Sequence, residues 1–179
     1  ELIEYYKGIF TILSSCASRQ LEEVTFRRTV IPVQELLDAA GKYFKKLMKN
    51  RPERIELEIE PMEAKVIGDV NQLRFLLENL IDEALTVRED GVIRLQARKD
   101  NEYIRFLFTD TRREKSVEEL NQLFYPNLAR MTSGEKGELR GTEYLICKQI
   151  IRDHDEFAGR RGCRINAEPA EGGGFTVYF

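Results

Sequence analysis

Few side chains of this 179-residue chain have the type and spacing that chemistry requires. Glu83 lies near the end of a long apolar helical segment, and a carboxylate is a good ligand for Mg²⁺. Asp110 closes an alternating segment, where an aspartate commonly caps a turn. His154 is the only histidine, and no serine or cysteine pattern accompanies it. The sequence therefore offers carboxylates for ligand binding but no set of residues for nucleophilic catalysis.

The run at 111–115 (TRREK) that follows Asp110 is densely charged. We interpret it mainly as a solvated loop, with anion binding by Arg112 or Arg113 as the alternative. Glu83 likewise has an alternative interpretation as a solvated helix residue beside Asp82.

The elements that would position these residues follow from hydrophobic periodicity. Apolar residues recur at three- and four-residue spacing in segments predicted to be helices, at 1–18, 33–49, 70–87, 117–124 and 142–153. Alternation predicts strands at 24–30, 54–60, 64–67, 92–98, 103–109, 163–167 and 175–179. The polar segment 125–140 is predicted to be a loop. This order predicts an α+β fold with helices stacked on one face of a mixed sheet.

Composition excludes several classes of function. Hydrophobic residues make up 42% of the chain, which is enough for a sizeable core. The formal net charge of -3 gives no reason to expect nucleic-acid binding. No apolar run approaches the roughly 20 residues that span a bilayer, so we expect no membrane contact by this segment. Because the first residues have the pattern of the inside of a helix, we expect a piece of a longer protein. We expect this piece to be cytoplasmic, whether or not the longer protein is anchored in a membrane.

Four motifs occur in order along the chain. They are GDVNQLRFLLENLIDEALTV (68–87), DTRREKSVEELNQLFYPN (110–127), GTEYLICKQIIRDH (141–154) and GGGFTVYF (172–179). They resemble the N box, the first glycine box with the F box, the second glycine box, and the last hairpin of the GHKL superfamily. That superfamily contains histidine kinases, gyrase, MutL and Hsp-type chaperones. The resemblance runs from about residue 24 to 179. It implies a two-layer Bergerat fold like the ATPase domain of bacterial sensor histidine kinases.

The resemblance also implies ATP and Mg²⁺ as ligands. Asn79 matches the kinase branch, because gyrase and MutL place a glutamate there. Glu83 occupies the position of the asparagine that holds Mg²⁺, and Asp110 that of the aspartate that reads the adenine amino group. Glycines in the lid and second glycine box approach the phosphates. The implied nucleotide-binding residues are Asn79, Glu83, Asp110, Gly134, Gly137 and Gly141, with Glu83 as the Mg²⁺ ligand and no catalytic residue.

The chain departs from the family pattern where nucleotide would bind. Arg112 and Glu114 replace two glycines whose bare backbone lies against adenine. Glu83 brings a negative charge toward the triphosphate, and Glu143 stands where a helix N-terminus would meet phosphate. We predict a degenerate signalling domain with weak or no ATP binding. Two alternatives stay open: an active kinase domain that phosphorylates a histidine on another segment, and a protein-interaction module that uses the eroded pocket.

The resemblance divides the chain into an N-terminal helix at 1–20, the end of a dimerisation hairpin or a linker, and an ATPase-like domain at 21–179. It implies a homodimer through residues 1–18 and a response regulator, or another protein of two-component signalling, as partner. His154 corresponds to a structural histidine. The family's phosphoacceptor lies on another helix, so the chain by itself leaves open whether it belongs to an enzyme.

Overall fold

In a computed structural model, the described residues are 3, 26–126 and 142–179. The helices among them are α2 (Val33–Met48), α3 (Val70–Ala84), α4 (Val117–Asn121) and α6 (Glu143–Phe157). The strands are β1 (Thr29–Pro32), β2 (Ile55–Ile59), β3 (Lys65–Gly68), β4 (Gly91–Asp100), β5 (Tyr103–Asp110), β6 (Asn166–Pro169) and β7 (Phe175–Tyr178). None of the described helices combines the length and apolar character needed to cross a membrane.

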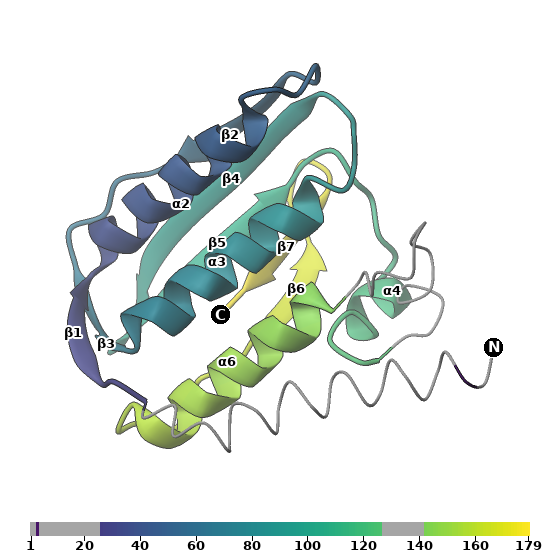
Figure 1. Ribbon diagram of the computed structural model, residues 1–179. Coiled ribbons are helices and arrows are strands. Elements are labelled where there is room, and N and C mark those ends of the chain that lie inside the picture. Colours follow the sequence, from purple (N-terminus) through teal and green to yellow (C-terminus); the bar gives the residue numbers. More distant parts are fainter. Residues whose placement is uncertain (1–2, 4–25, 127–141) are drawn as a thin grey trace.

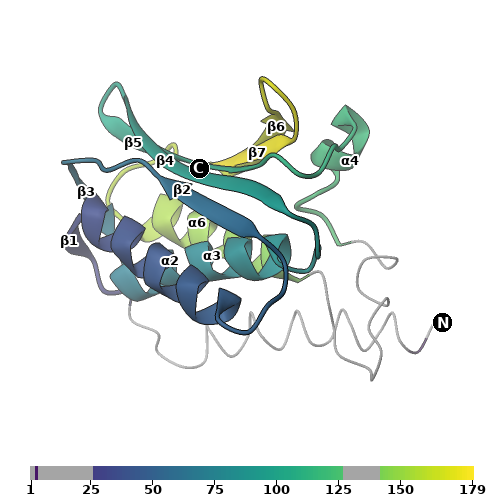
Figure 2. The ribbon, with the colours of Figure 1, turned by 90° about the horizontal axis from the view of Figure 1, so that it is seen from above.

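The main sheet has five strands in the order β2-β4-β5-β7-β6. β2 and β4 are parallel, and the other neighbouring strands are antiparallel. Helices α2, α3 and α6 lie side by side on one face of this sheet (Figures 1 and 2). The predicted α+β architecture, a mixed sheet with helices on one face, is therefore confirmed.

The core lies between these two layers. The helices contribute apolar stripes, and the central strands contribute alternate residues such as Ile93 and Leu95, which are fully buried. Burial of a leucine or isoleucine contributes about 1.5–3 kcal/mol, so this interface accounts for much of the folding free energy. The core residues of α2 and α3 include Val33, Leu36, Leu37, Leu76, Leu77, Leu80 and Ile81.

Two predicted strands lie elsewhere than expected. The strand predicted at 24–30 lies at β1, Thr29–Pro32, because it pairs with the four-residue strand β3, whose last residue Gly68 lies opposite Thr29. Residues 24 and 25 lie outside the described residues. The strand predicted at 163–167 is β6 at Asn166–Pro169. The backbone N–H groups of Gly162 and Cys163 donate to the Asp155 carboxylate at 2.7 and 3.0 Å instead of joining a ladder. Almost all of the predicted helix at 1–18 and most of the predicted loop at 125–140 lie outside the described residues.

His154 joins α6 to the start of α3. Its Nε2 accepts from the Asp69 N–H at 3.1 Å, and its Nδ1 lies 2.8 Å from the Ile150 carbonyl oxygen. The Asp69 carboxylate in turn caps α3 through the N–H groups of Asn71 and Gln72. Burial lowers the pKa of His154 below its usual value, which favours the neutral ring. These contacts confirm the predicted structural role of the histidine.

Candidate functional site

Three elements meet at the candidate site. Asp110 is the last residue of β5, Glu83 lies in the last turn of α3, and Tyr144 lies in the first turn of α6. The loop that follows β5 passes between them and carries Arg112 and Arg113. The site therefore depends on the ends of elements that are far apart in the sequence.

The Asp110 carboxylate is bound by both arginines of this loop. Arg112 donates to it from Nε at 2.9 Å, from a terminal guanidinium nitrogen at 3.0 Å and from its backbone N–H at 3.0 Å. Arg113 donates from Nε at 3.0 Å. Burial by itself raises the pKa of Asp110, but the arginine hydrogen bonds outweigh it and hold the pKa below its usual value. Asp110 is therefore an ionised carboxylate whose two oxygens both have partners.

Arg112 also caps the C-terminal end of α3. Its guanidinium donates to the carbonyl oxygens of Ala84 at 2.6 Å, and of Val87 and Glu89 at 3.0 Å each. Helix ends leave such carbonyls without intrahelical partners, and they attract cations. The Arg112 side chain is only 1% exposed. The interpretation of this charged run as a solvated loop is therefore wrong for Arg112, because carbonyls and a carboxylate take the place of water.

Glu83 is bound by Arg113 and Tyr144. The Arg113 guanidinium donates to both carboxylate oxygens, at 2.8 and 2.7 Å, which is the two-point geometry favoured by this ion pair. The Tyr144 hydroxyl donates to Oε2. Burial and Glu83 raise the pKa of Tyr144 well above its usual value, so the hydroxyl stays protonated. The Glu83 side chain is 14% exposed, which contradicts the alternative of a solvated helix residue.

The remaining loop residues contact the β6–β7 turn. Glu114 accepts a hydrogen bond from the Gly174 N–H at 3.0 Å. The Arg113 guanidinium carbon lies 5.2 Å from the centroid of the Phe175 ring, within the range of a cation–π contact. Glu114, which replaces one of the family's glycines, and Arg113 thus hold the loop against its own sheet.

The structure brings only part of the predicted site together. Glu83 and Asp110 are linked through Arg113, whereas Asn79 is buried and its side-chain amide donates to the Phe75 carbonyl of its own helix at 2.8 Å. Glu143 begins α6, where its charge suits the helix N-terminus as predicted. Three predicted glycines, Gly134, Gly137 and Gly141, lie outside the described residues.

One contributor to the site, Tyr144, was missed from the sequence, because it looks like one more apolar residue of an amphipathic helix. Arg113 was considered only as an alternative anion-binding residue within a run of charges. Glu83 lies 30 positions before Arg113 and 61 before Tyr144, so no local spacing indicates these contacts. The nearest signal is the i,i+3 relation between Asp110 and Arg113.

The negative charges of Glu83 and Asp110 are neutralised by the positive charges of Arg112 and Arg113. The four side chains together carry no net charge. Within the described parts of the chain, no group of three or more histidine, cysteine, aspartate or glutamate residues is arranged to hold a metal ion. As arranged, Glu83 does not fit a Mg²⁺ ligand, because Arg113 occupies both of its oxygens. Asp110 likewise has no oxygen directed toward open space for an adenine amino group.

Comparison with known proteins identifies relatives of this fold. A sequence model of the family described as histidine kinase-, DNA gyrase B- and HSP90-like ATPase matches residues 68–179, more than half of the chain. No curated protein matches the sequence.

Solved structures of histidine kinases resemble the chain. The catalytic domain of histidine kinase ThkA is 19% identical, with a TM-score of 0.64 over 86% of this chain and 94% of that one. The mycobacterial sensor histidine kinase MprB is 17% identical, with a TM-score of 0.65 over 85% of this chain and 95% of that one. Full-length ShkA in complex with AMPPNP is 14% identical, with a TM-score of 0.70 over 98% of this chain and 35% of that one. At these identities the likeness concerns the fold.

Proposed function

The chain belongs to the histidine kinase-, DNA gyrase B- and HSP90-like ATPase family, and from this premise we propose that it is a signalling domain that binds ATP weakly or not at all. It acts through contacts with other protein segments rather than through phosphoryl transfer. The proposal rests above all on one observation: the Asp110 carboxylate, 1% exposed, is bound by Arg112 and Arg113.

The energetics of the arginine network support this proposal. For Asp110 to read adenine and Glu83 to bind Mg²⁺, at least one buried ion pair must open. Leaving one buried charge of such a pair without compensation costs about 3–5 kcal/mol, which sets the upper bound on the cost of opening it. Each 1.4 kcal/mol is a factor of about ten, so the loss in affinity is up to about a hundred- to a few-thousandfold. At that bound, a micromolar nucleotide site would become a submillimolar or millimolar one.

The same network gives the domain a structure that needs no ligand. Arg113 and Tyr144 join α3 to α6 through Glu83, and Arg112 joins the end of β5 to the end of α3. A domain held in this way can present its surfaces to a partner in the absence of nucleotide. We propose a protein of two-component signalling, such as a response regulator, as that partner. One solved structure of ThkA is a complex with the response regulator protein TrrA.

Calorimetry with ATP and Mg²⁺ tests the proposal. We expect no measurable heat of binding at micromolar nucleotide and at most a weak response at millimolar concentration. A variant that returns the site to the family pattern, Glu83→Asn with Arg112→Gly and Glu114→Gly, should bind ATP more tightly than the unchanged chain if it remains folded by circular dichroism. A micromolar Kd in the unchanged chain that Asp110→Asn abolishes would favour the active kinase domain instead.

A further inference from the structure

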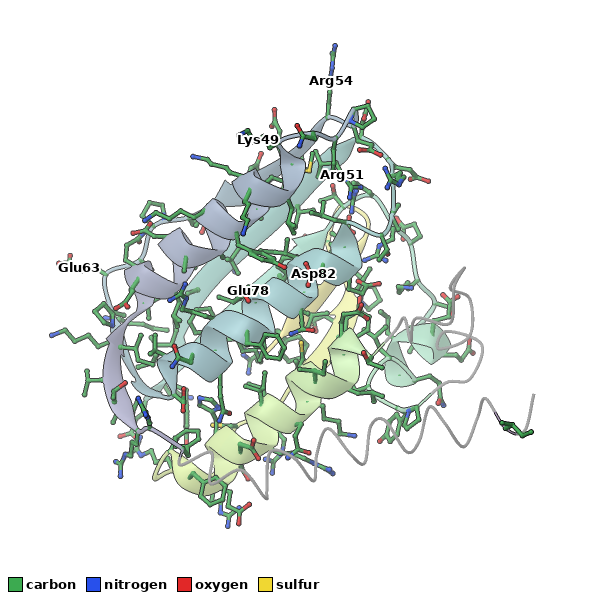
Figure 3. The ribbon with its side chains drawn as sticks, in the orientation of Figure 1. Lys49, Arg51, Arg54, Glu63, Glu78 and Asp82 are labelled. Carbon is green, nitrogen blue, oxygen red and sulfur yellow. The ribbon has the colours of Figure 1, made fainter. Side chains whose placement is uncertain are left out.

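A second concave site lies between the C-terminal ends of α2 and α3. It is a cavity of about 290 Å³ lined by Leu47, Arg51, Asp82, Leu85, Thr86 and Arg88, here called the α2–α3 pocket. Figure 3 shows Arg51 and Asp82 at this end of the two helices, with Lys49 beyond them and Arg54 directed away from the molecule. None of these residues belongs to the arginine network described above.

The walls of the pocket are fixed by hydrogen bonds. Arg51 donates to the Leu85 carbonyl at 2.8 Å and to the Glu53 carboxylate at 3.2 Å. Glu53 also accepts from Arg88 at 3.2 Å, while the Arg88 side chain stays 69% exposed. Side chains that are held in place before binding lose less conformational entropy when a partner binds.

The pocket combines an apolar floor with one acidic wall. Leu47 and Leu85 provide the apolar surface, and Leu85 is almost fully buried. On the α3 side, Asp82 accepts a hydrogen bond from the Tyr43 hydroxyl at 2.6 Å. Arg51 and Arg88 are both paired with Glu53, and Asp82 repels a second carboxylate, so an apolar side chain suits the leucine surface of the pocket better than a carboxylate does.

Exposed lysines lie on α2 and directly after it, close in sequence to the pocket residue Leu47. Lys42 and Lys46 of α2 and Lys49, the C-cap residue that follows it in helical conformation, are exposed and spaced i, i+4 and i+7, which places them on one stripe. Within the described parts of the chain, these lysines form no ion pair. We call these three residues the lysine stripe. Together with Arg88 it attracts anionic groups at the rim.

A lipid surface fits this face less well than a protein does. Membrane-binding faces insert protruding apolar side chains between lipids. Among the described residues, the large exposed apolar side chains lie elsewhere, for example Val30 on β1, Phe75 in the first half of α3 and Val117 on α4. Around the pocket the apolar groups are recessed, as in a site that receives a side chain.

We propose that the α2–α3 pocket and the lysine stripe dock an acidic segment of a partner protein. An apolar side chain of that segment contacts Leu47 and Leu85, and flanking carboxylates pair with Lys46, Lys49 and Arg88. Interfaces commonly have this form, an apolar anchor inside a charged rim that sets specificity and association rate. The proposal is independent of whether ATP binds.

The test uses the whole chain without nucleotide and a short fluorescein-labelled peptide that carries one leucine among glutamates. Binding is measured by fluorescence anisotropy at low salt. Lys46→Glu with Lys49→Glu should weaken binding about tenfold or more. The matched control, Arg160→Glu with Arg161→Glu, makes the same change in net charge on exposed residues that are distant in sequence from the pocket. It should leave the Kd within about twofold. If the melting temperature of the first variant is lower than that of the unchanged chain, Lys46→Gln with Lys49→Gln replaces it.

A second peptide, with serine in place of the leucine, tests the pocket itself and should bind several times more weakly. Equal losses in the two charge-reversal variants, or equal binding of the two peptides, would overturn the proposal. It would also be overturned by undetectable peptide binding, or by tighter association with phosphatidylserine vesicles than with the leucine peptide.

Discussion

Asp110 keeps the residue type that the family resemblance assigns to adenine recognition, yet its partners are two arginines of its own chain. A buried carboxylate needs a counter-charge whether or not a ligand supplies polar contacts. Arg112 and Arg113 meet that need from two and three positions further along the chain. The residue type by itself therefore does not distinguish a ligand-binding aspartate from a structural one.

Replacing this carboxylate should destabilise the fold. Asp110→Asn leaves the buried Arg112 guanidinium without its counter-charge, so we expect a loss of about 3–5 kcal/mol in the free energy of unfolding. Asp100→Asn is the matched control, because the Asp100–Arg105 pair is roughly half exposed. It should cost no more than about 1 kcal/mol. Urea unfolding followed by circular dichroism measures both, and equal losses would contradict the structural role of Asp110.

His154 should make stability depend on pH near neutrality. Its pKa is lowered in the fold, so below the unfolded value of about 6.5 the unfolded chain binds more protons than the folded one. Stability is thus fully present above about pH 6.5 and falls as the pH is lowered. The contribution of Asp110, whose pKa is also lowered, is lost only below about pH 4.

The measurement is the melting temperature between about pH 7.5 and about pH 5.5. His154→Gln keeps a donor and an acceptor but cannot titrate. We expect it to melt lower at pH 7.5 and to show a flatter profile than the unchanged chain. An equally steep profile in the variant would assign the pH dependence to another group.

Among the elements, α3 is held at both ends by residues distant in sequence. Its N-terminus is capped by Asp69, whose backbone N–H is bound by His154 of α6. Its C-terminal carbonyls receive hydrogen bonds from Arg112 on one side and Arg51 on the other. Both arginines bind the end of the helix where cations are favoured. This places the two sites, the arginine network and the α2–α3 pocket, against the same helix end.

The β6–β7 turn should be sensitive at one glycine and tolerant at another. Gly174 has a φ of +81°, and a Cβ there would lie 2.1 Å from the Asp110 carbonyl oxygen. Gly172 has a similar φ of +88° but nothing within 4 Å. Gly172→Ala should therefore cost only the backbone strain, about 1–2 kcal/mol. Gly174→Ala adds overpacking of about 1–3 kcal/mol or more. Chemical denaturation of both variants measures the difference, and equal costs would mean that the close approach relaxes freely.

For the whole molecule, the sequence predicts self-association through residues 1–18, which lie almost entirely outside the described residues. The apolar stripe of that segment has the three- and four-residue spacing of a helix that pairs with a copy of itself. We expect the full chain to sediment as a dimer and a chain that lacks residues 1–18 to sediment as a monomer. A truncated chain that still dimerises would locate the interface in the domain itself.

The sequence by itself determined the layers of this protein. The apolar pattern of each helix and strand indicates which face meets the core, and this pattern can be read within a short stretch of sequence. The pattern was enough to predict the mixed sheet, the helices on one face and the leucine-rich helix α3. Two short strands were misplaced, because their positions depend on pairing with β3 and on the Asp155 turn.

Only the tertiary structure decided how the charged residues of the site are used. Glu83 and Arg113 were both visible in the sequence, but their contact joins a helix end to a loop 30 residues away. Arg112 was interpreted as solvated because a charge run normally is, whereas helix-end carbonyls and Asp110 bury it. Apolar packing follows a period that can be read within one segment of the sequence. The partner of a charged side chain depends on which distant segment the tertiary fold brings next to it. For that reason the fold could be predicted from the sequence, and the contacts of the charged residues in the site could not.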